Sequence, residues 1–122
     1  MRDESLNNTF KIKLRRNEMV TYISYWELNP DLDPSEIADV AQKIISRGLY
    51  PAEGVKELAW YVSTDYWGVS ISEAESEEAI MNEVNMWRIA KPGMIRVFKS
   101  AIAMKSADAI PLMVKLAKKV KG

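Results

Sequence analysis

The side chains able to do chemistry in this chain are carboxylates, hydroxyls, amines, guanidinium groups and aromatic rings, because its 122 residues include no histidine and no cysteine. Catalysis by Ser-His-Asp or Cys-His arrangements is therefore excluded, as are zinc sites made from Cys and His. The commonest catalytic base and the usual axial ligand of haem are absent for the same reason.

Aromatic and hydrogen-bonding side chains gather on the segments that we expect to be strands. Tyrosine and tryptophan rings can form an apolar pocket, in which hydroxyl and indole N–H groups orient a small planar molecule. The same side chains could instead pack a core or a subunit interface, where aromatic residues are common. The candidate ligand-binding residues are Tyr22, Tyr25, Trp26, Trp60, Tyr61, Ser70 and Arg96.

Two charged residues on expected strands extend this hypothesis. Arg96 could bind a carboxylate through two hydrogen bonds, and Glu57 could act as a base if it is desolvated. Alternatively, the two side chains pair with each other or lie exposed at strand ends. Four other glutamates, Glu73, Glu75, Glu77 and Glu78, line the start of an expected helix, where acidic residues are ordinarily structural. No carboxylate spacing is typical of a metal site, so we expect no metal and no cofactor.

Local patterns predict the elements that must position these residues. Residues 19–26 are rich in β-branched and aromatic types on both faces, which is typical of a central strand. Asp33 before Pro34 predicts the start of a helix, and Gly48 its end. Ser76 can cap a second helix. The expected strands are 19–26, 55–63, 67–72 and 94–104, and the expected helices start at Pro34, after Ser76 and between 106 and 111.

Residues 1–18 differ from the rest of the chain in being mainly polar. Within them Phe10, Ile12 and Leu14 alternate with basic residues, a period typical of a strand. This segment could be an edge strand protected by charge, or a flexible arm that orders on a partner. We therefore expect an N-terminal arm at 1–18 and a single domain at 19–122.

The expected order of elements is that of the ferredoxin-like α+β fold, a βαββαβ sandwich with an extra C-terminal helix. Its four antiparallel strands carry two helices on one face and leave the other face open. In this chain both faces of the first strand carry large apolar side chains, and an apolar open face is costly in water. We expect two copies to pack face to face as a dimeric α+β barrel.

A resemblance rests on residues 19–22 (MVTY), 51–56 (PAEGVK), 68–69, 72–74 and Trp87. Through them residues 19–104 resemble a family of small proteins of unknown function in the dimeric α+β barrel superfamily. The resemblance implies a ferredoxin-like protomer and a homodimer but no activity. Members of that family commonly carry Trp-His in the second strand. This chain has Tyr61-Val62 there, so a role for that imidazole is excluded.

The formal net charge of zero conceals a segregation of charge along the chain. Residues 19–90 hold four basic and thirteen acidic residues, a net charge of −9, whereas residues 91–122 have a net charge of +7. The charges could simply be the solvated faces of amphipathic elements, or the basic end of one copy could meet the acidic body of another. The acidic body disfavours nucleic acid, and no apolar stretch approaches a membrane span.

Together these observations predict a cytoplasmic homodimeric α+β barrel that binds a small apolar or aromatic molecule. One alternative is an oligomeric structural or interaction module without catalytic activity. Another is a cofactor-independent enzyme similar to the monooxygenases or isomerases of the wider superfamily. The sequence leaves open whether the protein is an enzyme, because a fold by itself does not choose among these functions.

Overall fold

The computed structural model describes residues 19–122, and our expectations for residues 1–18 lie outside the described residues. The order of elements confirms the predicted βαββαβ plan with an extra C-terminal helix. The elements are β1 (Val20–Leu28), α2 (Pro34–Ser46), β2 (Val55–Val62), β3 (Trp67–Ala74), α3 (Glu77–Ala90), β4 (Ile95–Ile102) and α4 (Ser106–Lys121).

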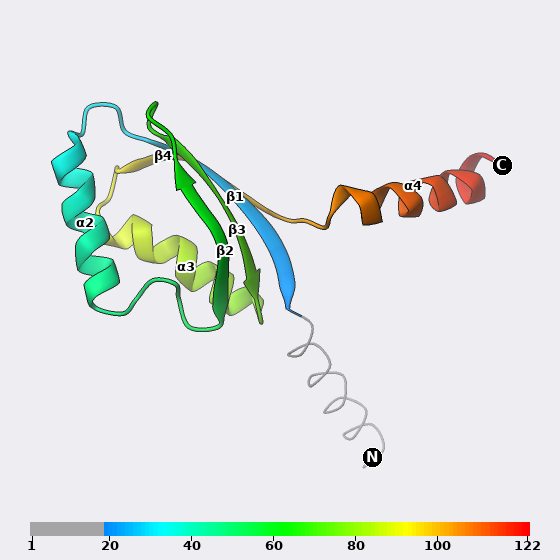
Figure 1. Ribbon diagram of the computed structural model, residues 1–122, viewed down its shortest axis with the longest axis horizontal. Coiled ribbons are helices and arrows are strands. Elements are labelled where there is room, and N and C mark those ends of the chain that lie inside the picture. The colour runs from blue at the N-terminus through cyan, green and yellow to red at the C-terminus, as the bar shows by residue number, and fades with distance from the viewer. Residues whose placement is uncertain (1–18) are drawn as a thin grey trace, which may run out of the picture.

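The four strands form one antiparallel sheet in the order β2-β3-β1-β4. Helices α2 and α3 lie on the same side of this sheet, and within residues 19–122 no helix covers the other side (Figure 1). We call the covered side the helix face and the other side the open face. The arrangement is the ferredoxin-like α+β fold expected from the sequence.

Strand β1 lies in the middle of the sheet and shows how its side chains divide between the two faces. Tyr22, Ser24 and Leu28 are buried on the helix face, whereas Ile23 between them is 44% exposed on the open face. The division follows from the period of two in a strand. A small core cluster forms where Tyr22 packs with Ala74 of β3 and Ala79 of α3.

Both helices of the helix face begin at side-chain caps, as predicted. The Asp33 carboxylate accepts a hydrogen bond from the backbone N–H of Ser35 at 2.8 Å, and Glu36 accepts one from the N–H of Asp33 at 3.0 Å. Ser76 accepts one from the N–H of Ala79 at 3.1 Å. These caps satisfy N–H groups that have no partner inside a helix and so fix where α2 and α3 start.

A bulge in β2 corrects the expected alternation of this strand. The sequence pattern places Leu58 with Trp60 and puts Glu57 on the opposite face. In the structure Glu57 pairs with Ser72 and Ala59 with Ile71, so Leu58 is an extra residue in the ladder. The inserted residue shifts the phase of the strand, which brings Glu57 onto the same face as Trp60.

A second irregularity, between β1 and β4, corrects the expected position of Arg96. The alternation in the sequence places Arg96 on the same face as Phe98. Phe98 pairs with Trp26 and Ile95 with Leu28, which leaves Arg96 in the irregular part of the ladder. The Arg96 side chain is exposed.

Helix α4 extends away from the sheet and from the other two helices (Figure 1). None of its residues is buried, and Pro111 lies inside its first turns. Within residues 19–122 no helix is long and apolar enough to cross a membrane. The large apolar residues exposed on α4 are Ile110, Leu112, Met113, Val114, Leu116 and Val120.

Candidate functional site

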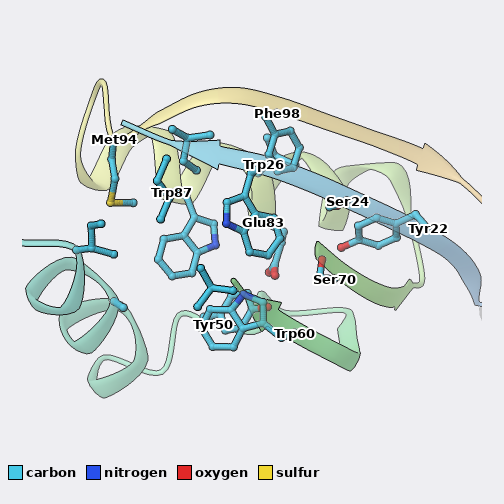
Figure 2. Close-up of a pocket in the computed structure, with 16 residues that line it drawn as sticks. Tyr22, Ser24, Trp26, Tyr50, Trp60, Ser70, Glu83, Trp87, Met94 and Phe98 are labelled. Carbon is cyan, nitrogen blue, oxygen red and sulfur yellow. The ribbon is translucent and has the colours of Figure 1, made fainter. Parts of the chain in front are cut away.

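A cavity of about 270 Å³ lies between the helix face of the sheet and helices α2 and α3 (Figure 2). All four strands contribute side chains to its lining, as do both helices and the loops that follow α2 and α3. Binding sites for small molecules commonly occupy such concave, mainly apolar spaces. We therefore treat this cavity as the candidate functional site.

Aromatic rings make up much of the cavity wall. Trp26 of β1, Trp60 of β2 and Trp87 of α3 all line it, and Tyr50 joins them from the loop between α2 and β2. The Tyr50 ring centre is 4.4 Å from that of Trp60 and 5.4 Å from that of Trp87. Aromatic pairs at such distances stabilise one another, so this part of the wall is a packed cluster.

Gly68 of β3 makes room for one of these rings. A Cβ atom added at Gly68 would lie 2.4 Å from Cζ2 of Trp26 and 2.6 Å from the carbonyl oxygen of Tyr61. Gly68 pairs directly with Trp26 in the sheet. The indole can therefore lie across the neighbouring strand because this residue has no side chain.

Tyr22 places an unpaired hydroxyl at the polar end of the cavity. The side chain is 2% exposed, and its oxygen has no hydrogen-bond partner among residues 19–122. The nearby Ser72 hydroxyl donates instead to Glu57, at 3.3 Å. Burial is the main cause that raises the pKa of Tyr22 to about 12. The charges of Glu83 and Glu57 act in the same direction, and the nearby Ser72 hydroxyl, which makes no well-formed hydrogen bond to Tyr22, acts against them. An unpaired buried polar atom of this kind is uncommon in proteins.

Glu83 of α3 brings a carboxyl group to the cavity. The residue is 8% exposed, and one of its oxygens accepts a hydrogen bond from the backbone N–H of Ala52 at 2.7 Å. Burial raises the pKa of Glu83 to about 7, and the charge of Glu57 adds to this, while the Ala52 hydrogen bond opposes it. Near neutral pH this carboxyl group can therefore hold or release a proton.

A second carboxyl group lies beside the first but is satisfied within the protein. Glu57 accepts hydrogen bonds from the hydroxyls of Tyr50 and Ser72. Burial raises the pKa of Glu57, although these two hydrogen bonds act against the shift. Burial and the contact with Glu57 in turn raise the pKa of Tyr50 far above its ordinary value. Near neutral pH the Tyr50 hydroxyl therefore keeps its proton.

The structure brings together part of the predicted set of site residues. Tyr22, Trp26, Trp60 and Ser70 all line the cavity. Tyr25, Tyr61 and Arg96 do not line it. Tyr25 pairs with Val69 on the open face and donates a hydrogen bond to Glu27 at 2.5 Å, and Tyr61 on the same face is 70% exposed.

The sequence-based prediction omitted several lining residues that have a clear chemical character. Glu83 lies on the apolar stripe of α3, three residues after Ile80 and four before Trp87, and a charged residue in such a stripe was an available signal. Tyr50 follows a helix in a loop and had no comparable signal. The other omitted residues with polar or large side chains are Ser24, Trp87, Met94 and Phe98.

Metal binding has no support from the arrangement of carboxylates. Within residues 19–122 no group of three or more carboxylates could hold a metal ion. The half-buried Glu57 and the buried Glu83 instead accept hydrogen bonds from hydroxyl and backbone N–H groups. The site therefore has the chemistry of a mainly apolar pocket to which Tyr22, Ser24 and Ser70 contribute hydroxyl groups and Glu83 a carboxyl group.

Comparison with known proteins supports the fold. The chain is similar to a dimeric ferredoxin-like protein of unknown function from Thermobifida fusca YX, with 11% identity over 71% of this chain and 92% of that one and a TM-score of 0.50. A conserved protein from Methanosarcina mazei Go1 (11% identity, 72% and 93% covered, TM-score 0.47) is also similar. So is a hypothetical protein from Arabidopsis thaliana (14% identity, 72% and 88% covered, TM-score 0.49).

No family model matches the chain, and no curated protein matches it. The similarity to the Thermobifida protein shows a ferredoxin-like α+β fold. Membership of the particular family of unknown function that the sequence resembles remains a prediction.

Proposed function

We propose that this protein is a homodimer that binds a small apolar or aromatic molecule in the cavity between its sheet and its helices. The observation that carries the proposal is the unpaired, buried hydroxyl of Tyr22 at the end of a cavity lined by three tryptophans. A buried hydroxyl without a partner costs about 1–3 kcal/mol. A ligand with one hydrogen-bonding group would recover that free energy.

The size of the cavity limits the ligand to a compact molecule. Its volume of about 270 Å³ exceeds the ~150 Å³ of a cavity that takes up benzene, and it is near the lower end of the range for ligand pockets. A molecule of one or two rings fits this range. The polar group of such a ligand belongs near Tyr22, and its rings belong against Trp26, Trp60 and Trp87 (Figure 2).

The homodimer is proposed from the open face of the sheet. Ile23, Trp67 and Ile71 are each about two-fifths exposed there, and Tyr61 is exposed further. Packing this face against a second copy would remove apolar area from water, which is favourable by about 25 cal/mol per Å². The similar Thermobifida protein is described as dimeric. The cavity lies on the helix face, so dimerisation through the open face leaves it free.

Filling the cavity is the experiment that tests ligand binding. Calorimetric titration with 2-phenylethanol, indole and 2-naphthol should detect at least one complex with the unmodified protein. Ala41→Phe places a ring in the cavity from α2 and should abolish that binding. Ala38→Phe, on the exposed side of the same helix, is the matched control and should bind normally. Absence of binding by all three compounds, or equal binding by both variants, would refute the proposal.

A second candidate is an assembly module without a ligand, and helix α4 is the observation that favours it. This helix exposes apolar side chains along its length and carries Lys115, Lys118, Lys119 and Lys121. An amphipathic helix without a partner is typical of a segment that docks on another chain. Light scattering of the full chain, compared with a chain ending at residue 105, distinguishes the candidates. Loss of all association on truncation would favour assembly.

A further inference from the structure

Glu83 is a buried carboxyl group that has no positively charged partner among residues 19–122. No lysine or arginine is among the residues that line the cavity, and no cation is among the groups that act on the Glu83 carboxyl. Strand β1 and the loop before β2 bring the hydroxyls of Tyr22 and Tyr50 to the cavity that Glu83 lines. Helix α2 contributes only apolar side chains to the same lining, and the other charge that acts on Glu83 is that of Glu57 on β2. Buried carboxylates in proteins are ordinarily paired with a cation or a metal.

The Arg88 guanidinium group contacts one of the lining rings from outside the cavity. The Arg88 guanidinium carbon is 5.6 Å from the centre of the Phe98 ring, and the Arg88 side chain is exposed. Arg88 is not among the lining residues. Among residues 19–122, the lining of the cavity therefore holds the Glu83 carboxyl group and no cationic side chain.

The walls of the cavity suit a positive charge as well as an apolar body. Faces of tryptophan rings attract cations by about 0.5–2 kcal/mol, depending on desolvation. Trp26, Trp60 and Trp87 supply three such rings around the Glu83 carboxyl group (Figure 2). The unpaired Tyr22 hydroxyl oxygen faces the same space and can accept a hydrogen bond from an N–H group.

We propose that the ligand of this cavity is a protonated amine carried on a compact aromatic or aliphatic body, with its ammonium group held between Glu83, the Tyr22 hydroxyl and the tryptophan rings. This inference rests on the proposed function and specifies the chemical class of its ligand. An ammonium group offers three N–H donors, which matches a carboxylate and one hydroxyl oxygen. A carboxylate ligand would meet the Glu83 carboxyl group and, among residues 19–122, no lining cation, so we expect the cavity to exclude it.

The competing explanation is that Glu83 keeps its proton and binds a neutral oxygen of the ligand. Burial raises the pKa of Glu83 to about 7, so both protonation states occur near neutral pH in the unliganded protein. The two explanations predict opposite dependence on pH. An amine should bind more tightly as pH rises from 6 to 8, because Glu83 becomes ionised, whereas a neutral ligand that accepts the proton should bind less tightly.

Three compounds that share a phenylalkyl group but differ in charge test the proposal by calorimetric titration at pH 7.5. We expect 2-phenylethylamine to bind about tenfold more tightly than 2-phenylethanol, because a charge-assisted hydrogen bond and cation–π attraction replace neutral contacts. We expect no binding of 3-phenylpropanoate. Equal affinity for the amine and the alcohol would overturn the amine inference and leave the proposed function intact. Failure of both compounds would contradict the amine inference and count against the proposed function as well.

Substitution of the carboxyl group tests its role directly. Glu83→Gln keeps an oxygen that can accept from the Ala52 N–H, so the local backbone contact can persist. We expect this variant to lose about tenfold in affinity for 2-phenylethylamine, and with it the preference for the amine over 2-phenylethanol. Glu73→Gln, on the open face, is the matched control and should retain the preference for the amine. An unchanged preference in Glu83→Gln would refute the role of Glu83.

Discussion

The two faces of the sheet carry similar kinds of side chains in different surroundings. Tyr22, Trp26 and Trp60 on the helix face line a cavity between the sheet and helices α2 and α3, and Trp60 is also partly exposed. Tyr25, Tyr61 and Trp67 on the open face lie on the surface of the protomer, and the Tyr25 and Trp67 ring centres are 6.2 Å apart. Aromatic content by itself therefore does not locate a binding site. The phase of each strand decides which rings meet a helix and which meet solvent or a second copy.

The polar groups sharpen the contrast between the faces. On the open face the Tyr25 hydroxyl is exposed and donates to Glu27. On the helix face, within the described part of the chain, the Tyr22 hydroxyl has no hydrogen-bond partner and the buried Glu83 carboxyl group has no cationic partner. Unpaired polar groups in a buried position carry a free-energy cost, and such costs persist in proteins mainly at functional sites. These two groups support the ligand site that we propose on the helix face, whereas the open face carries the apolar side chains of the proposed interface.

The largest change in the free energy of unfolding should come from removing an aromatic ring that lies between the sheet and α3. We expect Trp87→Ala to lower the free energy of unfolding by about 3–5 kcal/mol, because it removes a packed ring from the cavity wall. Trp67→Ala on the open face, where the ring is 41% exposed, should cost much less in the monomer. Urea unfolding of dilute protein measures both values. Equal losses would mean that the faces do not differ as described.

The second-largest effect that we expect is a fall in the free energy of unfolding with rising pH, caused by Glu83. Because the pKa of Glu83 is about 7 when folded and 4.5 in its reference state, the unfolded chain releases this proton at lower pH. Stability is therefore highest when the group is protonated in both states. It falls by up to about 3 kcal/mol as pH rises from 4.5 to 7, and then levels off.

Unfolding of Glu83→Gln at several pH values isolates this contribution. The variant should lose most of the slope between pH 4.5 and 7, leaving a smaller fall of the same sign from Glu57, whose pKa is also raised. Glu73→Gln on the open face should keep the slope of the unmodified protein. A slope that survives unchanged in Glu83→Gln would show that this carboxyl group does not carry the buried charge.

A smaller effect should distinguish the two tyrosines on the opposite faces of β1. Tyr22→Phe removes a buried hydroxyl that has no partner, so we expect the free energy of unfolding to rise by about 1 kcal/mol. Tyr25→Phe removes an exposed hydrogen bond and should leave stability nearly unchanged. Thermal unfolding without ligand compares the two variants. A loss of stability in Tyr22→Phe would mean that this hydroxyl is satisfied in solution.

The smallest effect concerns the charges of the proposed dimer. If the acidic body of one copy meets the basic end of another, higher salt should weaken association by up to about 1 kcal/mol, because exposed pairs are screened. Sedimentation equilibrium at 0.05 and 0.5 M salt measures the change. Association that does not depend on salt would mean that the apolar open face forms the interface and that the segregated charges do not contribute to dimerisation.

Much of the fold was predictable because its signals are local. The caps at Asp33 and Ser76 and the alternation in β3 depend on residues close together in the chain. The bulges at Leu58 and Arg96 were not predictable in this way, because pairing with a neighbouring strand decides where an extra residue is accommodated. This is why Glu57 lies on the helix face and Arg96 away from the cavity.

The candidate site was predictable to the extent that it lies on strands. Tyr22, Trp26, Trp60 and Ser70 reach the cavity from positions that the alternation identifies as one face or the other. Tyr50 reaches it from a loop whose path depends on how α2 packs on the sheet, and such packing has no local signal. Glu83 could have been identified, since a charged residue on an apolar helix stripe requires an explanation.

The indole N–H resonances of the four tryptophans provide the most direct test of the contrast between the faces. Trp26, Trp60 and Trp87 line the cavity, and Trp67 lies on the open face. In a two-dimensional NMR titration with 2-phenylethylamine or 2-phenylethanol, we predict that the first three resonances shift in a saturable way and that the Trp67 resonance does not. A saturable shift confined to Trp67, or no shift at any tryptophan, would contradict a ligand site on the helix face.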